Sequence, residues 1–160
     1  MPSTNAGLFT LQLCTALGCG LVAGVFFAFS TFVMQALGQQ PPAQGIATMQ
    51  AINVTVINPW FMGVLFGSGL ACLALVIAVL AKGNQPGAGY VLIGSLLYLV
   101  GTIVVTIAFN VPLNDALAVV EPNSTEGTTL WASYLNTWTL WNHVRMLASL
   151  GAAALLTLSL

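Results

Sequence analysis

The sequence predicts an all-α membrane protein, built as a bundle of four transmembrane helices with one short interfacial helix and an extramembrane extension of the last helix. Two observations predict this class. Charged residues make up 3% of the 160 residues and hydrophobic ones 58%, whereas about a quarter of a soluble domain is charged. Four apolar segments reach the ~20 residues that a helix needs to cross a bilayer core. We therefore expect residues 1–160 to form a single integral membrane domain.

The four expected spans cover residues 11–34, 60–80, 90–109 and 140–160. A Gly- and Pro-containing turn that starts at Lys82 separates the second span from the third. Lys82 is the only basic residue in a loop, so the positive-inside rule places it in the cytoplasm. Both termini then lie in the cytoplasm as well, and we expect a bacterial inner (plasma) membrane.

Two long connections lie on the opposite side of the membrane, at residues 35–59 and 110–137. In the first, residues 43–57 follow a Pro-Pro pair and are too few to span, which predicts an interfacial or re-entrant helix. In the second, Ser124 or Thr125 can cap a helix that continues into the last span.

Small residues recur every four positions in the first two spans. They are Gly20, Gly24 and Ala28 in the first span and Gly63, Gly67 and Ala71 in the second. Such spacing lets membrane helices approach closely. We expect the stripes to pack within the bundle, and formation of a homo-oligomer is the alternative.

Arg145 is the only charged residue inside an expected span. A guanidinium at membrane depth costs roughly 3 kcal/mol on insertion scales, so it usually faces a polar interior or a partner. At 100° per residue, one helical face carries Trp131, Tyr134, Trp138, Asn142, Arg145 and Ser149. We expect Asp115 to be the counter-ion of Arg145, with a solvated, helix-capping Asp115 as the alternative.

Polar residues gather at the end of the bundle that holds Arg145, which predicts a small-molecule site with aromatic walls. Gln50, Asn53, Asn110 and Asn114 would line it beside Asn142. Trp60, Trp131, Trp138 and Trp141 would form its roof, although each tryptophan could instead be an interfacial anchor. Arg145 could likewise extend its charge to the interface instead of lying buried.

His143 is the only histidine and the usual residue type for a general base near neutral pH, but its helical phase turns it away from Arg145. It is as compatible with packing as with a role in the site. Without Cys or carboxylates at ligand spacing we expect no metal site, and without a basic surface no nucleic-acid partner.

Four stretches carry a resemblance to a known family: residues 23–30, residues 49–53, Asn-Val-Pro-Leu-Asn-Asp at 110–115, and Trp138 followed by Trp-Asn-His-Val-Arg at 141–145. The last two are the specific ones, because polar residues at membrane depth are rare by chance. With them the chain resembles the anthrone oxygenase-like family of small four-span membrane proteins over nearly its whole length.

The resemblance implies oxidation of an anthrone to an anthraquinone by O2 with no stored cofactor. An anthrone is planar and apolar, and the anion left by loss of its benzylic proton reacts with oxygen directly. A site for it needs a base, a group that stabilises the oxyanion, and a dry pocket. On this hypothesis Arg145 and Asn142 stabilise the enolate oxygen, and Asp115 or His143 accepts the proton.

Two other readings stay open. The chain could bind a lipid or other hydrophobic ligand, or stabilise a partner, without catalysis. It could also be a small carrier or channel subunit. Two features argue against transport: only one charged residue is embedded, and the sequence shows no pair of discontinuous helices in related halves.

Overall fold

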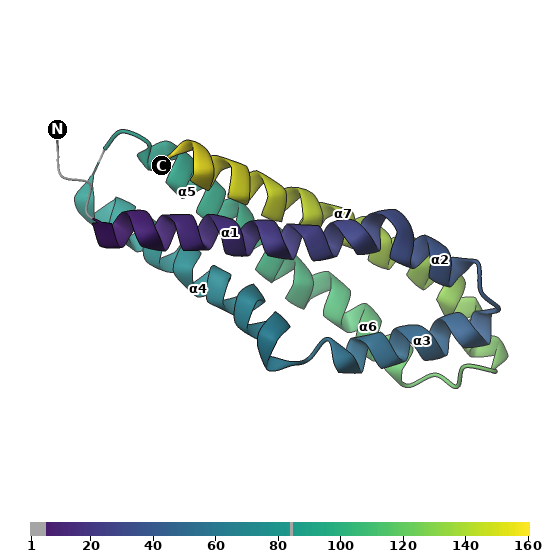
Figure 1. Ribbon diagram of the computed structural model, residues 1–160. Coiled ribbons are helices and arrows are strands. Elements are labelled where there is room, and N and C mark those ends of the chain that lie inside the picture. The colour runs from purple at the N-terminus through teal and green to yellow at the C-terminus, as the bar shows by residue number, and fades with distance from the viewer. Residues whose placement is uncertain (1–5, 84) are drawn as a thin grey trace.

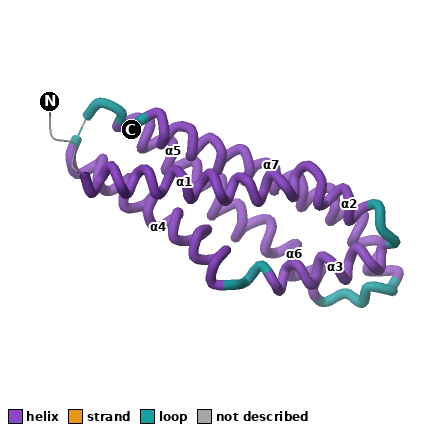
Figure 2. Tube along the Cα trace, in the orientation of Figure 1, coloured by secondary structure: helices purple, strands orange, loops and turns teal. Residues whose placement is uncertain are grey.

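The computed structural model describes residues 6–83 and 85–160, and every regular element in that part of the chain is a helix. Long helical stretches run side by side and are joined by short loops (Figures 1 and 2). The expected all-α class is therefore confirmed. The start of α1 and the end of α7 lie at one end of the molecule, and the turn between α2 and α3 lies at the other (Figure 1).

The first long stretch is one continuous helix, Ala6–Gly38, made of α1 (Ala6–Ala28), the π-helical segment η1 (Phe29–Val33) and α2 (Met34–Gly38). In η1 the Met34 N–H donates to the Phe29 carbonyl five residues earlier. This wider turn changes which backbone groups are free to meet side chains of other helices.

The short helix α3 (Pro42–Thr55) confirms the expected helix in the first connection, and the second stretch is α4 (Pro59–Lys82). Asn58 caps α4, because its side chain accepts hydrogen bonds from the Trp60 and Phe61 N–H groups. Gly83 ends α4 at φ 76°, a left-handed conformation that glycine adopts without steric cost.

The third stretch runs from Ala88 to Ala118. It consists of α5 (Ala88–Leu96), two π-helical segments, η2 (Leu97–Val104) and η3 (Thr106–Asn110), and α6 (Val111–Ala118). The sequence placed the end of this helix near residue 109, so residues 110–118, expected in a connection, are helical instead. This keeps Asn110 and Asn114 on a rigid element.

The fourth stretch is α7 (Thr125–Leu158), the longest helix of the chain. Ser124 caps it by accepting a hydrogen bond from the Gly127 N–H, as the sequence predicted. The six residues expected on one face of this helix, from Trp131 to Ser149, are all buried. A single unbroken helix therefore carries the whole polar face.

The four stretches pack in a ring: α7 contacts α1 and α5–η2, and α4 contacts α1 and α5. Three of them, Ala6–Gly38, Pro59–Lys82 and Ala88–Ala118, are long and apolar enough to cross a membrane. These stretches indicate a membrane protein. The polar face of α7 sets it apart from the three.

The packing expected for the small-residue stripes is found at Gly20, where a Cβ would lie 3.9 Å from the Ala153 Cβ, but it is wrong for three other glycines of the stripes. A Cβ at Gly24, Gly63 or Gly67 would meet nothing within 4 Å. The close approaches occur at other glycines, such as Gly101 against Ala148 and Gly45 against the Trp131 ring. A four-residue repeat of small residues predicts a helix face without large side chains, but it does not predict which helix packs against that face.

Candidate functional site

Arg145 is 5% exposed at the centre of a cluster contributed by α1, η3 and α7. Its Nη2 donates to Asn142 Oδ1 at 2.7 Å and its Nη1 to Thr106 Oγ1 at 3.3 Å. The guanidinium carbon lies 4.3 Å from the centroid of the Phe26 ring and 5.1 Å from that of Trp138. Cation–π contacts of this kind partly replace lost hydration of the cation.

Asn142 connects Arg145 to the first helix. Its Nδ2 donates to the Phe26 carbonyl and to Ser30 Oγ, both at 2.7 Å. The acceptor carbonyl lies just before the π-helical segment η1, where the regular backbone hydrogen-bond register is interrupted. The amide therefore has all its donors used and points its oxygen at the guanidinium.

The third stretch meets α7 through a row of polar side chains in its π-helical segments. Thr102 and Ser149 share a hydrogen bond of 2.7 Å, and Asn110 Nδ2 donates to the Trp138 carbonyl at 3.2 Å. Asn110 Oδ1 and Arg145 Nε are both buried without a hydrogen-bond partner. Unsatisfied buried polar atoms are uncommon in folded proteins and indicate a strained site or an absent ligand or water.

Asn114 organises the aromatic part of the cluster. Its Oδ1 accepts from the Tyr134 hydroxyl and from Trp138 Nε1, each at 2.8 Å. Burial raises the pKa of Tyr134 above its usual range, although neighbouring Asn53 and the charge of Arg145 oppose the shift. Tyr134 is therefore a protonated phenol that donates at physiological pH.

The two α3 candidates lie at the outer edge of this cluster. Gln50 Nε2 donates to the carbonyls of Leu117 and Val120, at 2.9 Å and 3.0 Å, and so holds α3 against the end of α6. Asn53 approaches Tyr134, while its Nδ2 is buried without a hydrogen-bond partner. Within the described part of the chain, neither side chain forms a hydrogen bond with Arg145.

The expected ion pair between Asp115 and Arg145 is wrong. Within residues 6–83 and 85–160 Arg145 forms no ion pair, and Asp115 is exposed on α6. The reason is the continued helix: Asn110 and Asn114, four residues apart, face α7, and Asp115 is rotated about 100° away from Asn114. His143 is half-buried and lies two residues before Arg145, about 200° around α7, as its helical phase predicted.

The predicted tryptophan roof is only partly correct. Trp131 and Trp138 are buried, and Trp141 is half-buried, with its ring stacked on Phe109 at 3.7 Å between centroids. Trp60, in contrast, is 86% exposed at the start of α4 and covers nothing. Its position in sequence next to the first connection did not show that this side chain is exposed.

The structure also adds residues that the sequence did not place in the site. Phe26, Ser30 and Thr102 join Arg145 or its partners from other helices. Ser30 and Phe26 lie in one of the stretches that carry the family resemblance. No periodicity marked them, because their π-helical neighbourhood changes the residue phase of the face.

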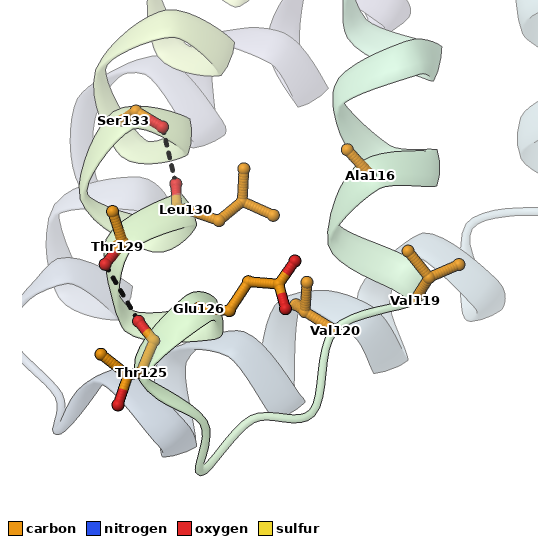
Figure 3. Close-up of a pocket in the computed structure, with 8 residues that line it drawn as sticks. All are labelled: Ala116, Val119, Val120, Thr125, Glu126, Thr129, Leu130 and Ser133. Atoms are coloured by element: carbon orange, nitrogen blue, oxygen red, sulfur yellow. Dashed lines mark hydrogen bonds between the residues drawn. The ribbon is translucent and has the colours of Figure 1, made fainter.

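A separate hollow of about 640 Å³ opens between α6 and the first turns of α7 (Figure 3). Its walls are the side chains of Ala116, Val119, Val120, Thr125, Glu126, Thr129, Leu130 and Ser133. The Glu126 carboxylate points into it, while the Thr129 and Ser133 hydroxyls bond back to their own helix (Figure 3). None of the residues expected to bind substrate lines this hollow.

The described residues contain no group of three or more His, Cys, Asp or Glu side chains placed to hold a metal ion. The fold and the buried cluster together define a helical membrane protein with a polar site between apolar helices. A family model described as anthrone oxygenase matches residues 59–155, more than half of the chain. The protein belongs to the anthrone oxygenase family.

The matched range contains the two specific stretches, 110–115 and 138–145, whereas the two in the first third of the chain fall outside it. Searches of curated proteins and of solved structures gave no significant match for the chain. The family assignment therefore covers the third and fourth helical stretches, from which most of the Arg145 cluster is built.

Proposed function

We propose that the protein is an integral membrane oxygenase that oxidises a small anthrone- or quinol-like aromatic compound with O2 and needs no stored cofactor. The observation that carries this proposal is the buried, uncompensated charge of Arg145, held by Asn142 and bracketed by aromatic rings. Membership of the anthrone oxygenase family supports it.

The chemistry needs few groups from the protein. In an anthrone the reacting methylene carbon loses two hydrogens and gains one oxygen atom as a carbonyl, and the second oxygen atom leaves as water. The electron-rich intermediate is an enolate whose oxygen carries the charge. Arg145 stabilises that oxygen, Asn142 fixes the guanidinium, and Trp138 and Phe26 offer apolar surface to the rings.

The membrane arrangement is part of the same proposal. The fourth stretch, α7, crosses the membrane with its apolar C-terminal half, and its N-terminal turns with α3 lie at the non-cytoplasmic interface. Support comes from its packing against two of the three apolar stretches, Ala6–Gly38 and Ala88–Ala118. Lys82 lies on the cytoplasmic side of a bacterial inner membrane together with both termini.

The direct test is oxygen-dependent quinone formation from a panel of small anthrones. Membranes with wild-type protein, Arg145→Ala at equal level and no protein are compared, because anthrones autoxidise slowly. We expect a wild-type rate clearly above both controls. A wild-type rate equal to that of empty membranes across the panel would reject the oxygenase proposal.

A second candidate is a non-catalytic protein that binds a hydrophobic ligand. The hollow between α6 and α7 favours it, since its volume of about 640 Å³ is of the size that small molecules occupy and its walls are largely apolar. Mass spectrometry of purified wild type and Leu130→Trp would test it. A co-purifying molecule lost only from the variant supports binding there, and identical ligand content removes this candidate.

A further inference from the structure

Arg145 is a buried cation without an anion. The chain has three acidic side chains, Asp115, Glu121 and Glu126, and all three are exposed in the structure. None of them forms an ion pair with Arg145 among the described residues. A charge taken out of water without a partner is unfavourable, so a site of this kind gains free energy when an anion arrives.

The guanidinium also has donors to spare. It carries five N–H groups in a fixed planar arrangement. It donates two hydrogen bonds here, one to Asn142 and one to Thr106. Nε is buried without a partner, as is Oδ1 of neighbouring Asn110. The free donors of a buried cation are a built receptor for a negatively charged oxygen.

Among the residues that the structure describes, no side chain beside Arg145 is suited to take a proton. The groups that face it or its partners are Phe26 and Ser30 from the first helix, Thr102, Thr106 and Asn110 from the third, and Trp138, Asn142 and Ser149 from α7. Tyr134 is a titratable group close enough to act on the charge of Arg145, and its proton is engaged with Asn114 Oδ1. Asp115 and His143 both point elsewhere.

We infer, on the basis of the proposed function, that Arg145 selects its substrate as a preformed aromatic anion and that no protein side chain acts as the general base. The acidic C–H or O–H bond of the substrate breaks outside the cluster, and the proton goes to water or buffer. The electron pair stays on the substrate oxygen, which then pairs with the guanidinium. The substrate class is therefore planar aromatics that ionise near the working pH, such as acidic anthrones and hydroquinones.

The pH dependence of turnover separates this inference from catalysis by a protein base. The full chain is assayed with three substituted anthrones whose own pKa values, measured in the same detergent, differ. We expect kcat/KM to rise with pH and its midpoint to move with the pKa of each substrate, because the ionised fraction sets the rate. A midpoint that stays fixed across the three substrates would overturn the inference, since it would belong to a protein group.

Two matched variants sharpen the same experiment. His143→Gln and Asp115→Asn remove the candidate bases, and we expect kcat/KM within about twofold of wild type with unchanged midpoints. A loss of about 100-fold in either variant, the scale typical of a removed general base, would identify that residue as the base and reject the inference.

A binding measurement keeps the inference testable if turnover is absent. The probe is 2-hydroxyanthraquinone, which is planar, stable to O2 and changes colour on ionisation. With wild type we expect the bound dye to ionise at a pH lower by at least about one unit than with Arg145→Ala, a tenfold preference for the anion. The same ionisation pH with both proteins would reject anion selection. The predicted shift without anthrone turnover would reject only the oxygenase.

Discussion

The two halves of the bundle have cores of different side chains. Near the termini most core side chains are small or aliphatic, such as Cys19, Cys72 and Ala152, and Phe26 and Tyr98 are the aromatic members. Toward α3 and α6 the core is aromatic and contains Trp131, Tyr134 and Trp138. The two cores therefore differ in the size and kind of the side chains that fill them.

The polar groups follow this division. Where helices approach closely, as at Gly101 and Ala148, the polar contact beside them is between two small hydroxyl side chains, Thr102 and Ser149. Beside the aromatic rings, Asn110 and Asn114 form hydrogen bonds with α7, and Asn142 of α7 forms one with α1. The charged and amide side chains useful for chemistry thus gather beside the aromatic rings, whereas the buried polar residues of the other half are mainly hydroxyls such as Thr15, Ser68 and Ser95.

The largest expected effect tests the polar half. Arg145→Lys keeps the charge but replaces a planar group with five donors by a point charge with three. We expect kcat/KM for anthrone oxidation to fall roughly 100- to 1,000-fold, the scale seen when a donor to a developing oxyanion is removed. Protein level and thermal unfolding in detergent should stay close to wild type, because no carboxylate loses a partner.

A different pattern would break the comparison. If Arg145→Lys retains activity but unfolds at much lower temperature, the polar half serves packing as the other half does. Asn136→Ala on the exposed face of α7 is the matched control, since its amide bonds only to its own helix.

The next effect tests the close-packed half. A Cβ at Gly101 would collide with the Ala148 Cβ, whereas one at Gly67 meets nothing within 4 Å. Gly101→Ala should therefore lower the free energy of unfolding by about 1–3 kcal/mol, the usual range for overpacking. Gly67→Ala should leave it unchanged or raise it by up to ~1 kcal/mol, as alanine favours helix over glycine. Equal stability of the two variants in denaturation titrations would show that the helices do not approach closely at Gly101.

The smallest effect tests a single hydrogen bond of the aromatic core. Tyr134→Phe removes the bond to Asn114 Oδ1, which keeps a second donor in Trp138 Nε1. We expect a loss of about 0.6 kcal/mol, the average for side-chain hydrogen bonds between membrane helices. Tyr90→Phe, at an exposed position, is the control. A loss of several kcal/mol for Tyr134→Phe alone would mean that the network is strongly cooperative.

The sequence by itself determined the class and much of the site. Low charge and long apolar segments gave a helical membrane protein, and a 100° period along one helix placed Trp131 to Ser149 on a buried face. The cap at Ser124 and the break at Asn58–Pro59 could also be predicted from the sequence, because they depend on local chemistry. Local periodicity suffices wherever one regular helix carries the whole pattern.

Only the tertiary structure decided which residues meet. It kept Asp115 away from Arg145 and left Trp60 exposed. It brought Phe26 and Ser30 to the cluster. It also placed the closest helix contacts at glycines such as Gly101, outside the predicted stripes. The physical reason is that the π-helical segments and the continued helix at 110–118 shift the phase of each face, and relative helix rotation is set by packing of all side chains together. A buried cation without a counter-ion, the basis for anion selection, became visible only from that arrangement.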